Sequence, residues 1–227
     1  MAKDARVYAK KIKAALSPTE QQIFRKLSTP QKVQDYLDTF KTNFQERRAG
    51  MFSPRVMIPK KKLQCMEGAL FAAAALAYHG HFPLLMDFQT IAEDEDHVVA
   101  LFKQKNLWGA VSKTNHAILR WRDPVYKTPR ELAMSYFHEY YLRRGQKSLL
   151  TFSKPFNLSR YAPERWVTSE EELEWLAVEL DESPHFPIFP GASKKTLGKL
   201  RPASPIELNL LKVIEWKDPR KKSQRLG

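Results

Sequence analysis

Apolar residues are spaced along this chain in two different ways, and the longest apolar run is rich in alanine. Residues 63–80 are mostly small or apolar, which favours a buried helix that begins near Cys65 and ends at a glycine. Shorter apolar runs, with lengths and polar boundaries typical of strands, follow at 84–88, 97–102 and 107–111. We therefore expect an α+β fold in which residues 84–126 form an antiparallel sheet and the Cys65 helix packs against it.

The first fifty residues have helical patterns. Ser17-Pro18-Thr19-Glu20 is a capping box with proline at the first helical position, and Ser28-Thr29-Pro30-Gln31 begins another helix. The second helix carries apolar residues at helical spacing, namely Val33, Tyr36, Leu37, Phe40 and Phe44. This spacing predicts an N-terminal helical segment that packs on the core.

Helical patterns return after the expected sheet. Thr128-Pro129-Arg130-Glu131 is a further capping box, and its helix is expected to end near Gly145. A proline-rich arm at 183–205 precedes a final helix that is expected to end near Trp216. The pattern predicts an N-terminal helical segment (1–50), a core (51–145), a loop-rich helical extension (146–216) and a basic tail (217–227).

The composition indicates a folded, basic protein. Of the 227 residues, 43% are apolar, which argues against disorder throughout, and the formal net charge is +13 with Lys and Arg concentrated at both ends. This charge predicts nonspecific nucleic-acid binding at low salt, although the chain has no zinc-finger, helix-turn-helix or RNA-binding aromatic motif. No membrane span is expected, because the most apolar stretch, 68–86, is interrupted by Gly80 and Pro83.

Cysteine and histidine positions give no indication of a metal. A single cysteine excludes an internal disulfide and a multi-cysteine zinc site, and it fits a reducing cytoplasm. His185 lies between two apolar residues without a ligand partner at a familiar spacing. We expect no metal, no cofactor and a cytoplasmic location, the last also because residues 1–6 lack the apolar run of a signal peptide.

Cys65 is the strongest candidate for chemistry. A thiol in the first turn of a helix lies near unpaired N–H groups and the positive end of the helix dipole, and Lys60, Lys61 and Lys62 precede it. These features predict a lowered thiol pKa and a nucleophilic role. The alternative is a structural role, because free cysteines are usually buried and behave as small apolar residues.

The segment from Cys65 to Val111 resembles the core of the transglutaminase-like superfamily, which comprises circularly permuted relatives of papain. The shared features are a cysteine that opens a helix ending in glycine, a strand near a Gly-x-Pro turn, a histidine (His97) that heads the next strand, and a strand carrying a tryptophan (Trp108). The resemblance covers about residues 60–125 and is most particular to a bacterial group for which no substrate is assigned. It implies a Cys65–His97 pair.

The resemblance also implies an aspartate on the strand after the histidine, where it would orient the imidazole. A turn at residues 103–106 pairs Phe102 with Leu107, and antiparallel register then sets His97 opposite Ser112. The expected aspartate position is therefore occupied by serine, which departs from the family pattern.

Two other residues are candidates for orienting His97, and both rank ahead of Ser112. Asn115 lies just past the expected position, and asparagine orients the histidine of papain-like enzymes. Asp123, in Trp-Arg-Asp-Pro, is similar to the family's Trp-then-Asp-Pro signature. Asp96 is expected to point to the opposite face from His97, because successive strand residues alternate.

Two functions follow from this pattern. The first is a cysteine-dependent acyl transfer, either hydrolysis or transamidation of a protein, peptide or small amide or ester substrate, in which Cys65 attacks and His97 moves the proton. The second is a noncatalytic interaction protein that keeps the fold, because the aspartate is missing at its expected position. Nucleic-acid binding through the basic ends is a third and weaker possibility.

Overall fold

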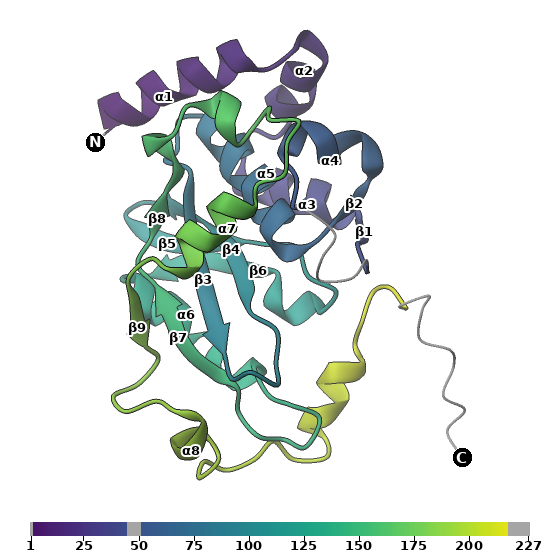
Figure 1. The fold of residues 1–227 in the computed structure, drawn as a ribbon, viewed down its shortest axis with the longest axis vertical. Coiled ribbons are helices and arrows are strands. Elements are labelled where there is room, and N and C mark those ends of the chain that lie inside the picture. Colours follow the sequence, from purple (N-terminus) through teal and green to yellow (C-terminus); the bar gives the residue numbers. More distant parts are fainter. Residues whose placement is uncertain (1, 45–50, 218–227) are drawn as a thin grey trace.

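The computed structural model describes residues 2–44 and 51–217, and in these residues the chain has an α+β fold (Figure 1). An antiparallel sheet lies at its centre with helices around it, which confirms the expected class. The helices are α1 (Ala2–Ala15), α2 (Pro18–Lys26), α3 (Pro30–Asp38), α4 (Pro54–Lys60), α5 (Cys65–Tyr78), α6 (Pro129–Met134), α7 (Glu174–Asp181) and α8 (Lys194–Leu197).

The described strands form one seven-stranded antiparallel sheet and one small parallel pair. The small pair joins β1 (Lys41–Thr42) to β2 (Lys62–Leu63). The large sheet has the order β6-β5-β4-β3-β7-β9, and β8 also pairs with β3. Its strands are β3 (Leu84–Thr90), β4 (His97–Gln104), β5 (Leu107–Val111), β6 (Trp121–Tyr126), β7 (Leu149–Ser153), β8 (Phe156–Asn157) and β9 (His185–Pro187).

The sheet corrects the expected division of the chain at residue 145. Strand β7 pairs directly with β3, with Phe88 opposite Phe152, and β9 pairs with β7, with Phe152 opposite Phe186. Residues 146–216 therefore supply three strands of the central sheet and are not a separate helical extension. Long-range pairing of short strands leaves little trace in local sequence pattern, which is why these strands were missed.

The N-terminal helices form as the capping residues predict. The Ser17 hydroxyl accepts the N–H of Glu20 at 3.3 Å, and the Glu20 carboxylate accepts the N–H of Ser17 at 2.7 Å. The Thr29 hydroxyl caps α3 in the same position by accepting the N–H of Lys32 at 3.2 Å. Apolar residues of these helices are buried in the core that surrounds α5, among them Ile12, Phe24, Val33, Leu37 and Phe40.

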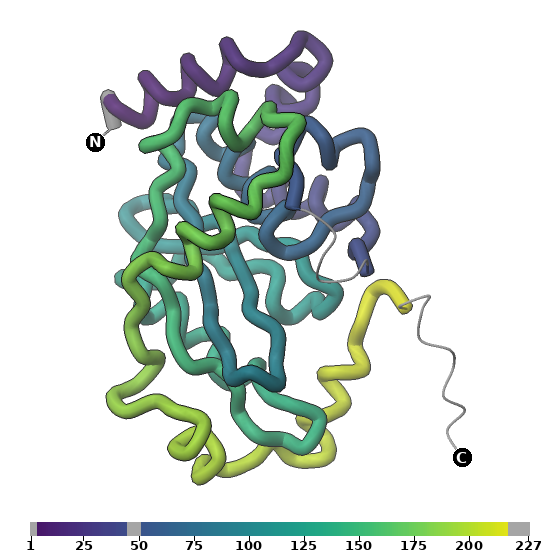
Figure 2. Tube along the Cα trace, viewed as in Figure 1, coloured from purple at the N-terminus to yellow at the C-terminus, as the bar shows by residue number. Residues whose placement is uncertain are grey.

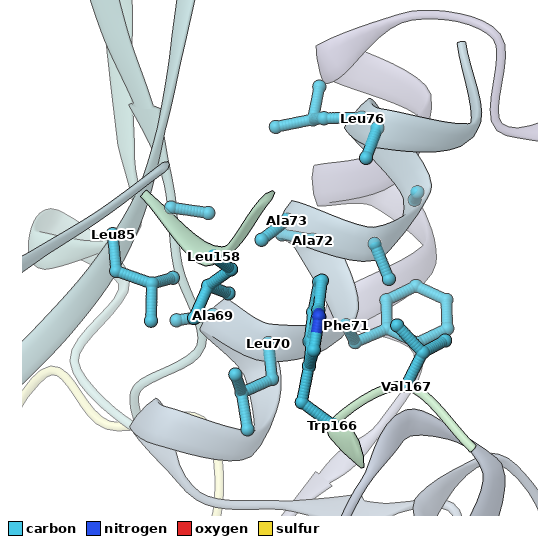
Figure 3. Close-up of a cluster of buried hydrophobic side chains, with 14 of the residues drawn as sticks. Ala69, Leu70, Phe71, Ala72, Ala73, Leu76, Leu85, Leu158, Trp166 and Val167 are labelled. Atoms are coloured by element: carbon cyan, nitrogen blue, oxygen red, sulfur yellow. The ribbon is translucent and has the colours of Figure 1, made fainter. Parts of the chain in front are cut away.

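Helix α5 is the centre of the larger of two core clusters (Figure 3). Every residue from Met66 to Tyr78 is buried, so the helix is apolar on all sides and is covered by other elements all round. Gly80, with φ of 92°, follows the helix in the left-handed region that glycine adopts without strain. Trp166 and Val167, from a distant part of the chain, lie against the helix as Figure 3 shows.

The second core cluster lies on the other face of the sheet. Along β4, Val98, Ala100 and Phe102 belong to the α5 cluster, whereas Val99 and Leu101 belong to the second. This alternation is what a strand covered on both faces requires. The second cluster is completed mainly by side chains from α6 and the segment after it, including Leu132, Ala133, Tyr136, Phe137 and Tyr140.

The C-terminal part of the chain passes the end of the molecule opposite α1, through α8, and its last described residues turn back toward the middle of the molecule (Figure 2). The helix expected to reach Gly145 ends at Met134, and a short 3₁₀ turn, Phe137–Glu139, follows it. The expected final helix is a 3₁₀ helix, Glu207–Lys212. The basic tail expected at 217–227 lies outside the described residues except for Lys217. The other 3₁₀ turns are Ala117–Leu119, Leu158–Arg160 and Pro163–Arg165.

Candidate functional site

Cys65 is the first residue of α5 and is partly exposed. The residue before it, Gln64, donates its N–H to the Glu67 carboxylate at 2.9 Å, which fixes the start of the helix. The backbone N–H groups of Val98 and Met66 point toward the Cys65 sulfur. Val98 directly follows His97, so the thiol lies at the end of the sheet where β4 begins.

Burial raises the pKa of the Cys65 thiol to about 11, in spite of the N–H groups of Val98 and Met66, which act in the opposite direction. The carboxylates of Asp87 and Glu95 raise it further. The lowered pKa expected from the helix start is therefore wrong. The helix dipole and nearby lysines depend on local sequence, whereas desolvation of the thiolate depends on the packing around it, and desolvation is the larger effect here.

His97 is the first residue of β4 and is only 5% exposed. The β4–β5 hairpin differs from the expected one, because Gln104 pairs with Leu107 and the turn consists of Lys105 and Asn106 alone. Both turn residues have positive φ, 49° and 66°, as a two-residue turn that matches the strand twist requires. The register is therefore shifted by two residues from the expected pairing of Phe102 with Leu107.

Ser112 nevertheless contacts His97. The shifted register places Ser112 diagonally from His97 on the same face, and its Oγ lies 3.2 Å from the His97 Nε2. The same Oγ lies 3.0 Å from the carbonyl oxygen of Leu119 and 3.1 Å from that of Arg120. Because carbonyl oxygens only accept, the hydroxyl donates to them and its lone pair accepts the Nε2–H of His97. His97 therefore carries its proton on Nε2, and Nδ1 is the basic nitrogen.

The other candidates for orienting His97 lie elsewhere. The Asn115 side chain binds the backbone of Trp216, with its Nδ2 2.8 Å from the carbonyl oxygen and its Oδ1 2.9 Å from the nitrogen. The Asp123 carboxylate accepts the indole N–H of Trp121 at 3.0 Å on the surface. Asp96 precedes β4 and accepts the N–H of Thr90 at 2.7 Å. Of the residues considered, Ser112, ranked last from sequence, is the one that meets the imidazole.

Cys65 and His97 lie at the same end of β4 without a direct hydrogen bond between them in the described part of the chain. By strand alternation the His97 side chain lies on the face of Val99, in the second cluster, whereas α5 packs on the face of Val98 and Ala100. The sulfur approaches the Val98 nitrogen, which is two covalent bonds from the His97 Cα. The two groups thus lie on either side of the first peptide unit of β4.

The thiol and the imidazole are both neutral at rest. Burial lowers the pKa of His97 to about 4, and the positive charges of Arg122 and His116 act in the same direction. With the pKa of Cys65 near 11, no thiolate–imidazolium pair forms at neutral pH. A proton would have to move from sulfur to Nδ1 during a reaction, as in serine hydrolases that begin from a neutral hydroxyl.

Asp87 and His185, which local sequence pattern does not mark as a pair, contact each other in the fold. Asp87 lies on β3 opposite Val98, and its side chain is 6% exposed. Its Oδ2 lies 3.3 Å from the His185 Nε2 of β9, and its backbone N–H donates to the Ser153 hydroxyl at 2.9 Å. This pair joins strands β3 and β9, which are separated by β7. An apolar context around both residues hid the pairing, which only the sheet order brings about.

The comparisons with known proteins add no assignment. A scan against protein-family models and a search of curated proteins found no match to this chain. Within residues 2–44 and 51–217, no helix has the length and apolar character needed to cross a membrane. The same described ranges contain no group of three or more His, Cys, Asp or Glu side chains placed to hold a metal ion.

Proposed function

We propose that this protein is a cysteine-dependent acyl-transfer enzyme with a transglutaminase-like core, in which Cys65 is the nucleophile, His97 the general base and Ser112 the orienting residue. The observation that carries the proposal is the 3.2 Å contact between the Ser112 Oγ and the His97 Nε2. Because the Ser112 hydroxyl also lies by two carbonyl oxygens, this contact assigns the imidazole proton to Nε2 and leaves Nδ1 as the nitrogen that can accept a proton. The Cys65 thiol, at the start of α5 and beside the start of β4, is the group that the His97 imidazole would deprotonate.

The reaction begins with transfer of the thiol proton to His97 Nδ1 and attack of the Cys65 sulfur on the carbonyl carbon of an amide or ester. The carbonyl π bond opens to an oxyanion, to which the Cys65 backbone N–H, at the first position of α5, can donate. The oxyanion then re-forms the carbonyl and expels the amine or alcohol, which takes the proton from the imidazolium. Water or an amine cleaves the thioester by the same steps in reverse.

Proton transfer requires the sulfur and Nδ1 to come within hydrogen-bond reach, about 3 to 3.5 Å between heavy atoms. Catalytic hydrogen bonds often tighten only when substrate is bound. The His97 side chain would approach the thiol around the first peptide of β4, where no further strand residue precedes it. This approach is the step of the proposal that the experiment has to establish.

A small ester tests the proposal directly. The intact protein should release p-nitrophenol from p-nitrophenyl acetate, Cys65→Ala should abolish the release, and His97→Gln should lower it by about 10²- to 10⁴-fold, the usual contribution of a general base. Ser112→Ala should change the pH profile while leaving some activity, since it removes only the orienting contact. Thermal unfolding of each variant serves as the control for folding.

Iodoacetamide labelling provides the second measurement. With a pKa near 11, the thiol of the intact protein should react more slowly at pH 7.5 than a free cysteine does, and the rate should still be rising at pH 10. Equal ester hydrolysis by the intact protein and Cys65→Ala, at equal stability, would overturn the enzymatic proposal.

A noncatalytic interaction protein is the second candidate, and two observations favour it. The pKa of Cys65 is raised and the pKa of His97 lowered by burial, as for structural groups in a core. The side chain of His97 also belongs to the sheet face opposite α5. This candidate predicts no Cys65-dependent turnover and the same slow labelling, so turnover decides between the two.

A further inference from the structure

The chain segment Ile214–Trp216 is bound along the loop that follows β5. The Glu215 N–H donates to the Asn115 carbonyl oxygen at 3.2 Å, and His116 forms a β-bridge with Ile214. The Asn115 side chain adds the two hydrogen bonds to the backbone of Trp216 described above. All of these contacts involve the backbone of the bound segment, so they would hold an extended peptide of almost any sequence.

The sequence-dependent contact is the Glu215 carboxylate. It binds the Arg120 guanidinium, and its Oε2 lies 3.5 Å from the Lys113 Nζ. The Lys113 side chain is fully buried and the Arg120 side chain 8% exposed, and Arg120 also pairs with Asp38 at 3.1 Å. The Lys113 ammonium has no hydrogen bond of normal length in the described structure, so the Glu215 carboxylate is its nearest compensating charge.

The electrostatics favour a carboxylate at this position. Burial lowers the pKa of Lys113, and the charge of Arg120 lowers it further. Burial opposes ionisation of Glu215 as well, but its hydrogen bond and ion pair with Arg120 hold its pKa below the usual value. Removing the carboxylate would leave two buried cations beside one partly exposed aspartate, which is a costly arrangement.

The apolar side chains near the segment are mostly exposed. Ile206, Val213 and Ile214 are 81%, 53% and 40% exposed, whereas Trp216 is partly buried, with the Lys41 Nζ 5.6 Å from the centre of its ring. The attachment of Ile214–Trp216 is therefore mainly polar and local, unlike that of the core strands. A segment held in this way can leave its site at much lower cost than a core element and can be replaced by another chain of the same chemistry.

We propose that the Lys113–Arg120 loop is a peptide-binding site that recognises an extended segment carrying a glutamate, and that residues Ile214–Trp216 occupy it in cis. The partner it fits is an extended peptide with one glutamate, added alongside Asn115 and His116, with its carboxylate on Lys113 and Arg120.

Occupancy of this site bears on the site of Cys65, and this consequence rests on the proposed function. Lys113 directly follows Ser112, which orients His97. A Cβ built on Gly68, in the first turn of α5, would lie 2.4 Å from the Lys113 Cβ, so loop and helix are in close contact. Movement of Lys113 would therefore displace both Ser112 and the start of the Cys65 helix.

The binding test uses full-length protein and a fluorescein-labelled peptide with the sequence of residues 210–217. Glu215→Lys places a third cation beside Lys113 and Arg120 and should release the internal segment. This variant should bind the labelled peptide in fluorescence anisotropy, whereas the unmodified protein should bind it at least tenfold more weakly because its own segment competes. A peptide with glutamine in place of the glutamate should lose most of the binding.

Glu207→Lys is the matched control, because it makes the same charge change in the 3₁₀ helix before the segment, where the Glu207 carboxylate pairs with the exposed Arg201 and accepts the N–H of Ser204. It should bind no more peptide than the unmodified protein. If the Glu215→Lys variant does not fold, as judged by circular dichroism, Glu215→Gln is used instead. It removes the carboxylate without adding a cation and so releases the Ile214–Trp216 segment with less disturbance of the loop. Absence of peptide binding to a folded Glu215 variant, or equal binding of the glutamate and glutamine peptides, would overturn the proposal.

A second readout separates this proposal from the proposed function. Peptide binding should persist in Cys65→Ala combined with the Glu215 substitution, because the peptide site does not include the thiol. In the single Glu215→Lys variant, the iodoacetamide rate of Cys65 should change severalfold and return when the peptide is added. Peptide binding without any change in that rate would retain the binding site and reject its coupling to Cys65.

Discussion

The buried side chain of His97 contacts the hydroxyl of Ser112. By strand alternation its imidazole lies on the sheet face of the second core cluster. The Ser112 backbone is fixed in turn by the Gln34 side chain. The Gln34 Nε2 donates to the Ser112 carbonyl oxygen at 3.0 Å, and the Gln34 Oε1 accepts the Ser112 N–H at 3.1 Å. Helix α3 thus holds the residue that fixes the tautomer of His97.

The low pKa of His97 predicts a loss of stability in acid. The unfolded chain takes up a proton on this residue below about pH 6.5, whereas the folded protein does so only near pH 4. Stability should therefore fall as the pH is lowered from 6.5 to 4, by about 3 kcal/mol from this group. Urea unfolding at pH 7 and pH 4 should give a smaller difference for His97→Gln than for the unmodified protein. An equal difference in the two proteins would contradict the buried neutral state.

The residues of the site were predictable in part. Cys65 at a helix start and His97 at a strand start follow from local pattern, and the structure has both in these positions. The direction of the thiol pKa was not predictable, because it depends on groups that packing brings near the sulfur, such as Asp87. Ser112 was identified through an incorrect register, and it reaches His97 as a diagonal neighbour.

The starts of the capped helices were predicted well, whereas the end of the helix after Thr128 and the register of the β4–β5 hairpin were not. A capping box is a contact within one turn of chain, so the residues that make it are visible in sequence. The β4–β5 turn contains Lys105 and Asn106, neither of which is glycine, although both have positive φ. Without a glycine to mark the turn, a four-residue polar loop at 103–106 was the simpler interpretation, and it shifted the register by two.

The strained turn gives a prediction at this scale. Replacing Lys105 and Asn106 by Asn-Gly should stabilise the protein by about 0.5 to 1 kcal/mol. Asparagine in place of Lys105, and glycine in place of Asn106, adopt positive φ at lower cost than the residues they replace. Chemical unfolding would measure the change. As a control, Lys103→Gly in β4 should destabilise by a similar amount, since it adds glycine to a strand and removes the ammonium 4.2 Å from the Trp108 ring. Destabilisation by the Asn-Gly turn would contradict the assigned turn conformation.

The whole molecule is held together by contacts between distant parts of the chain. The sheet joins residues 84–126 to strands β7 and β9, and helix α1 packs near residues 158–166. Sequence pattern predicted the starts of the capped helices and the presence of β3, β4 and β5, although with a shifted β4–β5 register. It could not predict the flanking strands, because β9 has three residues, one of them proline, and forms only through its pairing with β7.

Tyr8 links helix α1 to residues 158–166, which lie far from it in the sequence. Its hydroxyl accepts the indole N–H of Trp166 at 2.9 Å and lies 2.9 Å from the carbonyl oxygen of Tyr161, to which it donates. Trp166 is fully buried, so loss of the Tyr8 hydroxyl would leave its N–H without a partner. The contact should therefore contribute to the stability of the whole fold and not only to the attachment of α1.

Tyr8→Phe should destabilise the protein by about 1 to 3 kcal/mol, the cost of leaving a buried donor unpaired, with unfolding still in one transition. Trp166→Phe removes the donor but also creates a cavity, so the double variant separates the two effects. Tyr8→Phe should cost less in the Trp166→Phe background than alone, by about 1 kcal/mol or more, because no indole N–H remains to be orphaned. Urea unfolding of the four proteins measures this coupling. Additive effects would show that the hydrogen bond between Tyr8 and Trp166 does not stabilise the packing of α1 on the rest of the fold. A separate early transition in Tyr8→Phe would show that α1 unfolds independently of the sheet.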